Sequence, residues 1–121
     1  RIYKAALIIY PQHRALIYDY AAALLYDGSQ KEALKFINQQ LRFTPNDINL
    51  YQLQAQAYQA DGNTMLLHRA LAESYIRLGD LPRAINQLEL ALRSEDGDFY
   101  EISSAESRLK ELRRRLSLSE E

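Results

Sequence analysis

The sequence predicts an all-α fold in which antiparallel helix pairs stack into a solenoid, and three observations support this prediction. The chain of 121 residues has only four glycines and three prolines and is rich in helix-forming residues. Gly28 and Gly62 are 34 residues apart, as are Pro11 and Pro45. Near the C-terminus, apolar residues alternate at steps of three and four, as they do along one face of a helix.

The 34-residue step is the period of the tetratricopeptide (TPR) repeat, a helix–turn–helix unit, and the chain resembles this repeat at further positions. In a first unit, residues 14–47, Ala21 and Ala33 stand where the two helices must approach closely. In a second unit, residues 48–78, the aromatic, small, aromatic and turn positions are held by Tyr51, Ala55, Tyr58 and Gly62. An ordinary helical bundle with accidental spacing is the alternative.

The two ends of the chain are expected to be an incomplete unit and a cap. Residues 1–11 match the end of a preceding repeat, so the chain, which opens without methionine, is expected to be part of a longer protein. Residues 99–116 are expected to form a capping helix with a polar outer face and an apolar stripe of Ile102, Ala105, Leu109, Leu112 and Leu116. The tail LSLSEE is expected to fray.

One helix is predicted to serve two repeats. Gly62 and Gly79 are 17 residues apart, half a period, so the helix between them completes unit 48–78 and begins an overlapping unit, residues 65–96. This helix is apolar over most of its circumference, which is typical of a helix buried on two sides. Its one narrow polar stripe, which is expected to face solvent, consists of Arg69, Glu73 and Arg77.

The regular repeat is interrupted after Gly62. Leu67 stands where the second helix of a TPR unit usually has alanine, and Asp96 stands where the overlapping unit should have its terminal proline. These departures predict a change of curvature in this part of the array. No β-strand is expected, and the predicted helices are 12–26, 30–43, 47–60, 64–78, 81–93 and 101–116.

The composition argues against several classes of function. The net charge is −1 and the basic residues are spread along the chain, which disfavours a nucleic-acid-binding face. The apolar runs are shorter than the roughly 18 residues of a membrane-spanning helix. The chain has no cysteine, and neither His13 nor His68 lies in a metal-binding motif. We therefore expect no catalytic residue, metal site or cofactor in this chain.

The first helices of the two units carry the candidate binding surface. On the second unit, amide side chains at steps of three and four form one face that consists of Asn49, Gln52, Gln56 and Gln59. On the first unit, the corresponding surface is more apolar and contains Tyr18, Leu25 and Tyr26. Amides donate and accept hydrogen bonds and suit an extended peptide backbone, although glutamines on a helix can also simply face water.

Two other binding modes are alternatives to this amide face. The stripe of Arg69, Glu73 and Arg77 is an alternative, charged surface. The carboxylate clamp of co-chaperone TPR domains is not expected, because Tyr18 and Ala22 stand where that clamp has basic and asparagine residues.

Beyond the repeat itself, the C-terminal half of the chain resembles a narrower family. The pattern H-x-A-L-A-E occurs at 68–73, G-x-L-x-x-A-I-x-Q-L-x-x-A-L at 79–92, G-D-F-Y at 97–100, and A-x-x-x-L-x-E-L-R at 105–113. With the preceding PNDINLYQLQAQAYQADGN, this series resembles the C-terminal TPR region of BepA-type periplasmic zinc metallopeptidases.

The resemblance implies a parent enzyme in the Gram-negative periplasm, with zinc held by an H-E-x-x-H domain upstream of residue 1. It also implies that the TPR region contacts the parent's own protease domain, the outer-membrane assembly machinery and unfolded or assembling outer-membrane proteins. A stand-alone TPR adaptor of a secretion, pilus or envelope-polymer system is the second hypothesis. A purely structural role, in which the repeats cap or dimerise the parent, is the third.

Overall fold

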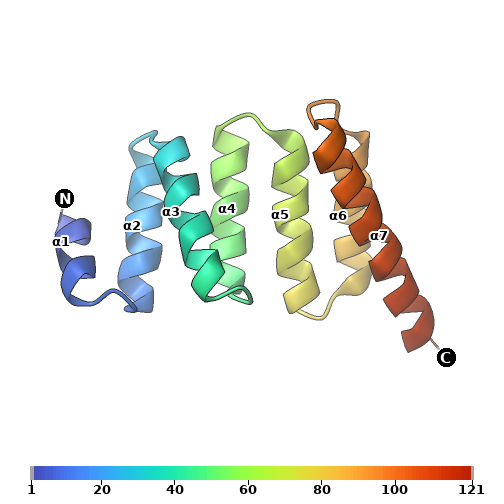
Figure 1. Cartoon of the computed structure of the whole chain (residues 1–121), viewed down its shortest axis with the longest axis horizontal. Helices are drawn as coiled ribbons and strands as arrows, with labels where there is room; N and C mark the ends of the chain where they lie inside the picture. The colour runs from blue at the N-terminus through green and yellow to red at the C-terminus, as the bar shows by residue number, and fades with distance from the viewer. Residues whose placement is uncertain (1, 121) are drawn as a thin grey trace.

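The computed structural model describes residues 2–120, and within this range it contains seven α-helices and no β-strand (Figure 1). The prediction of an all-α chain is confirmed. Arg1, the first residue of the predicted truncated unit, lies outside the described residues, as does Glu121, the last residue of the predicted tail. The helices are α1 (Ile2–Ile9), α2 (Arg14–Tyr26), α3 (Gln30–Phe43), α4 (Ile48–Ala60), α5 (Thr64–Arg77), α6 (Leu81–Arg93) and α7 (Phe99–Ser119).

The helices form an elongated row in which each helix packs against the next one in the chain (Figure 1). In addition, α2 packs against α4. This arrangement is consistent with an α-solenoid. The core is distributed along the row, with one cluster of buried residues formed by α2, α3 and α4 and a second formed by α5, α6 and α7.

Glycine turns and side-chain caps explain why the helices end and begin where they do. The backbone after α2, α4 and α5 turns through Gly28, Gly62 and Gly79, whose φ angles are 78°, 76° and 79°. This left-handed conformation is easily adopted by glycine, which has no Cβ. Asp47, Asn63, Asp80 and Asp98 then accept a hydrogen bond from the third backbone N–H of the helix that follows.

Small residues allow the helices to approach closely. Ala21 of α2 and Ala33 of α3 are completely buried, as predicted from their places in the repeat. They pack in one cluster with the fully buried side chains of Ile17, Ile37 and Leu50. The N-terminal half of the row is therefore stabilised by buried aliphatic side chains that pack around these alanines.

Helix α5 is packed on two sides, by α4 and by α6. Its buried residues are mostly small, namely Met65, Ala70, Ala72 and Ser74. The prediction that residues 64–78 form a helix buried against two neighbours is confirmed.

The loop between α6 and α7 is attached to the start of α5. The carboxylate of Asp96 accepts hydrogen bonds from the backbone N–H groups of Thr64, at 2.6 Å, and Met65, at 3.0 Å. These bonds hold the pKa of Asp96 below its usual value. Asp96, which stands where a repeat would have proline, thus caps α5 from a distance of about thirty residues in sequence.

The C-terminal helix is longer than predicted. It begins at Phe99 because Asp98 and Glu101 form a reciprocal capping box, in which each side chain accepts a hydrogen bond from the other's backbone N–H. It continues to Ser119, beyond the predicted end at 116, so part of the tail that was expected to fray is helical. Ala105, Leu109 and Leu112 are buried against α6, as the predicted stripe requires.

We predict that Gly97→Ala destabilises the fold by about 1–3 kcal/mol, the usual cost of overpacking. A Cβ at this position would lie 2.0 Å from the sulfur of Met65, which is completely buried. Urea unfolding measures the change. Glu95→Ala, an exposed substitution in the same loop, is the control and should have little effect.

A double-mutant cycle tests the cause. In a Met65→Ala background the methionine is gone, so adding Gly97→Ala should cost much less than it does in the wild-type chain. An equal cost in the two backgrounds would show that the collision with Met65 is not the reason.

Candidate interaction site

A polar groove lies between α2 and α4. Its volume is about 380 Å³, and its lining consists of Tyr18, Asp19 and Ala22 from α2 and Asn49, Gln52, Leu53 and Gln56 from α4. The packing of α2 beside α4 brings these side chains together. Three of the four predicted amides and Tyr18 therefore share one groove.

Asp47 holds one wall of this groove in place. Its side chain is only 9% exposed and accepts hydrogen bonds from the Tyr18 hydroxyl, at 2.7 Å, and from the backbone N–H of Leu50, at 3.2 Å. It also forms an ion pair with Arg14. Since the same carboxylate caps α4 and positions Tyr18, the aromatic wall and the amide wall of the groove have a common support. We refer to the surface of Tyr18, Asn49, Gln52 and Gln56 as the amide groove.

The other residues of the predicted surface lie outside the amide groove. Gln59 is exposed near the end of α4, and Tyr26 is 93% exposed at the end of α2. Leu25 is half-buried and packs against the core cluster around Ile17. The groove is thus shorter than the sequence pattern predicts.

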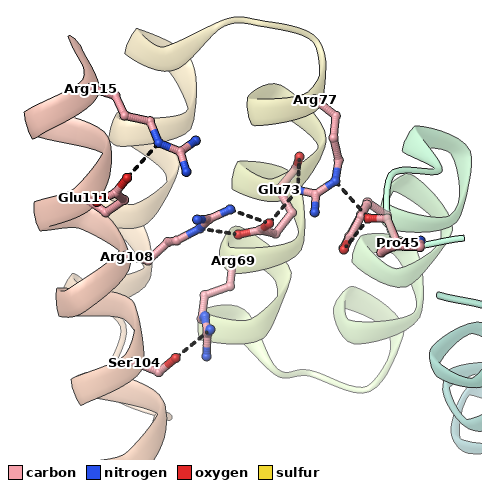
Figure 2. A network of polar contacts seen from close by, with 9 residues as sticks. Pro45, Arg69, Glu73, Arg77, Ser104, Arg108, Glu111 and Arg115 are labelled. Atoms are coloured by element: carbon pink, nitrogen blue, oxygen red, sulfur yellow. Dashed lines mark hydrogen bonds and ion pairs between the residues drawn. The ribbon is translucent and has the colours of Figure 1, made fainter. Parts of the chain in front are cut away.

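The polar residues of α5 take part in a network of ion pairs. The Glu73 carboxylate accepts a hydrogen bond from Arg77, at 2.6 Å, and two from Arg108 of α7, at 3.0 and 3.1 Å (Figure 2). The side chains of Glu73 and Arg77 are only 22% and 17% exposed. The expectation that this stripe faces solvent is therefore wrong for Glu73 and Arg77, because α7 places Arg108 opposite Glu73.

Arg77 extends the network to the loop before α4. Its Nε donates to the carbonyl oxygen of Pro45 at 3.0 Å, and its guanidinium lies 4.4 Å from the centre of the Tyr51 ring. We refer to Glu73, Arg77 and Arg108 as the Glu73 network. Burial alone would raise the pKa of Glu73, but the hydrogen bonds from Arg108 and Arg77 together lower it.

A second surface feature, near the N-terminus, is apolar. A groove of about 500 Å³ between α1, α2 and α3 is lined mainly by Leu7, Ile8, Tyr20 and Phe36. At its rim, the Glu32 carboxylate accepts a hydrogen bond from the Tyr20 hydroxyl at 3.3 Å and pairs with Lys4 at 3.7 Å. Because this lining is mainly apolar and the amide groove presents three amide side chains, the amide groove is the better candidate for recognising a peptide backbone.

The two histidines have structural partners. His68 is hydrogen-bonded to Gln87 at 2.8 Å, as expected for a packed histidine. The exposed ring of His13 accepts a hydrogen bond from the backbone N–H of Leu16 at the start of α2. Within residues 2–120 no group of three or more His, Cys, Asp or Glu side chains is arranged to hold a metal ion.

Comparisons with protein-family models and with curated proteins found no match to this chain. The resemblance to BepA-type proteins therefore stays a prediction. In the part of the chain that the structure describes, none of the helices has the length and apolar character needed to cross a membrane.

We predict that Glu73→Gln lowers the free energy of unfolding at pH 7 by about 1–2 kcal/mol, because a half-buried carboxylate with three charge-assisted hydrogen bonds is lost. The pKa of Glu73 is lower in the folded state than in the unfolded state. Its stabilisation is therefore complete above the ordinary glutamate pKa of about 4.3 and is lost as the pH falls through the folded pKa.

Urea unfolding of both chains between pH 7 and the acid range tests this prediction. The difference between wild type and variant should shrink below about pH 5, since a protonated Glu73 resembles glutamine. Glu89→Gln, which removes an exposed ion pair with Arg113, is the matched control and should change stability little. A wild-type advantage that persists unchanged in acid would contradict the assignment.

Proposed function

We propose that this chain is a non-catalytic, TPR-type protein–protein interaction module that binds an extended polypeptide segment in the amide groove. The proposal rests on one observation. Tyr18 lines the same groove between α2 and α4 as Asn49, Gln52 and Gln56. The contact between α2 and α4 also supports a TPR-like reading, since these helices begin successive 34-residue units.

The spacing of the amides suits an extended backbone. Gln52 and Gln56 are one helical turn apart, about 5.4 Å along α4. In an extended peptide, every second residue presents its backbone groups in the same direction, at a repeat of roughly 6.8 Å. Flexible glutamine side chains can bridge this small difference. Each amide offers both a donor and an acceptor, so it can bind backbone N–H and C=O groups whatever side chains the peptide carries.

The kind of protein in which this module acts is also a proposal. The motifs at 68–73 and 97–100 support placement in a BepA-type periplasmic metallopeptidase that acts in outer-membrane protein assembly and quality control. In that setting the ligand is an unfolded or assembling outer-membrane protein, and the zinc belongs to the parent's protease domain. The alternative is a stand-alone TPR adaptor of an envelope system. The gene sequence upstream of residue 1 distinguishes the two, because only the first requires an H-E-x-x-H motif there.

Substitution of the amides tests the binding mode. Gln52→Ala combined with Gln56→Ala should weaken binding of an unfolded outer-membrane β-barrel segment by roughly tenfold or more, since each lost hydrogen bond contributes about 1 kcal/mol. Binding should vary little with salt, because amides are neutral. Fluorescence anisotropy at low and high salt measures both effects.

Gln59→Ala is the matched control, because Gln59 lies on the same helix but outside the amide groove. It should leave the affinity unchanged. The melting temperature of the double variant should also be preserved, since Gln52 and Gln56 are exposed and alanine favours helices. An unaltered affinity in a folded double variant would refute the proposed binding mode.

The chain by itself should neither hydrolyse casein nor retain zinc. It contains no cysteine, and its two histidines bind Gln87 and a backbone N–H, so the nitrogen and sulfur ligands of a zinc site are not assembled. Metal analysis after dialysis against zinc-free buffer measures the second property. One tightly bound zinc ion per chain would contradict the non-catalytic assignment.

A further inference from the structure

A second polar groove crosses α5, separate from the amide groove. One hollow, of about 250 Å³, lies between α4 and α5, and another, of about 570 Å³, lies between α5 and α7. Both hollows are lined by Arg69 and Glu73, so they adjoin along the polar side of α5. Figure 2 shows these two side chains and Arg108 in the space between α5 and α7. We refer to this surface as the α5 groove.

Arg69 has no carboxylate partner among residues 2–120. Its Nη2 donates a hydrogen bond to the Ser104 hydroxyl at 3.0 Å, and it forms no ion pair within 4.0 Å in this range. Arg77 and Arg108, by contrast, share Glu73. Two guanidinium groups therefore share one carboxylate, and the charge of Arg69 has no partner of opposite sign among the described residues of the groove.

Two other carboxylates near the α5 groove already have partners. Glu111 pairs with Arg114 and Arg115, each at 2.9 Å. Glu101 accepts a hydrogen bond from the backbone N–H of Asp98 as part of the capping box. Neither contact involves Arg69, so the groove keeps an attraction for an external anion.

Hydroxyl groups add hydrogen-bond donors beside Arg69. Ser103, Ser104 and Ser107 lie at helical spacing on the side of α7 that lines the groove. The Ser104 oxygen accepts its hydrogen bond from Arg69, so its own proton is free to donate. A guanidinium next to such hydroxyls matches the two oxygens of a carboxylate, which accept several hydrogen bonds at once.

The length and the aromatic lining of the α5 groove indicate a polypeptide ligand. Tyr51 and Tyr58 line the hollow next to α4, and Tyr100, which is 78% exposed, lines the hollow next to α7. A free anion would need only the donors at Arg69, whereas aromatic rings on both sides can pack against apolar side chains. The charge and the aromatic walls thus complement an acidic residue with apolar neighbours.

We propose that the α5 groove binds a protein segment through an acidic side chain, whose carboxylate pairs with Arg69 and accepts a hydrogen bond from Ser104. This interaction does not depend on the amide groove, which lies between α2 and α4. Unlike backbone recognition by amides, it selects for a particular side chain and weakens at high salt.

Two peptide pools test the proposal on the 121-residue chain. Both contain seven-residue peptides with blocked ends and uncharged, mixed flanking residues, and they differ only in a fixed central glutamate or glutamine. The immobilised wild-type chain should retain the glutamate pool about tenfold better, as expected for a charge-assisted pair. In Arg69→Gln this preference should fall to about one. Comparable retention of both pools by the wild-type chain would overturn the proposal.

Matched variants separate a specific site from general charge. Arg93→Gln removes the same charge from an exposed position on α6 and should keep the preference. The double variant Gln52→Ala and Gln56→Ala should also keep the preference for the glutamate pool. A loss of binding in the amide groove is therefore distinguishable from a loss of binding at Arg69. Ser104→Ala should reduce the preference to about threefold, which provides a second test if Arg69→Gln folds poorly. Equal losses in Arg69→Gln and Arg93→Gln would refute a site at Arg69.

Discussion

The burial of α5 on two sides is the constraint on which the rest of this structure depends. Because α4 packs on one side and α6 on the other, the small side chains of Ala70, Ala72 and Ser74 are enclosed. Only a narrow polar strip of α5 stays outside these contacts. The position of α6 in turn places α7, which packs on α6 and brings Arg108 and Ser104 to that strip.

The helices could be predicted from sequence because their ends are set by local chemistry. Gly28, Gly62 and Gly79 adopt the left-handed conformation that ends a helix, and Asp47 and Asp98 supply the caps that begin one. Each of these signals acts within a few residues of the turn that it forms. The start of α7 was also visible locally, since aspartate followed three residues later by glutamate is a capping-box pattern.

The candidate sites were harder to predict, because they depend on contacts between distant segments. Glu73 and Arg108 are 35 residues apart in sequence, and so are Arg69 and Ser104. Helical spacing predicts that Asn49, Gln52, Gln56 and Gln59 share a face of α4, but it does not say how far the neighbouring α2 covers that face. Likewise, no local pattern indicates that Asp96 caps α5.

The Glu73 network affects how the row of helices unfolds from its ends. In a solenoid each unit contacts only its neighbours, so the ends can unfold one helix at a time while the middle stays folded. Glu73 connects α5 to α7, which are not successive helices, and Arg77 connects this network to the Pro45 carbonyl before α4. Opening of the C-terminal helix therefore also costs interactions in the centre of the chain. The terminal and central amide groups should accordingly exchange hydrogen as a cooperative unit rather than in order from the end.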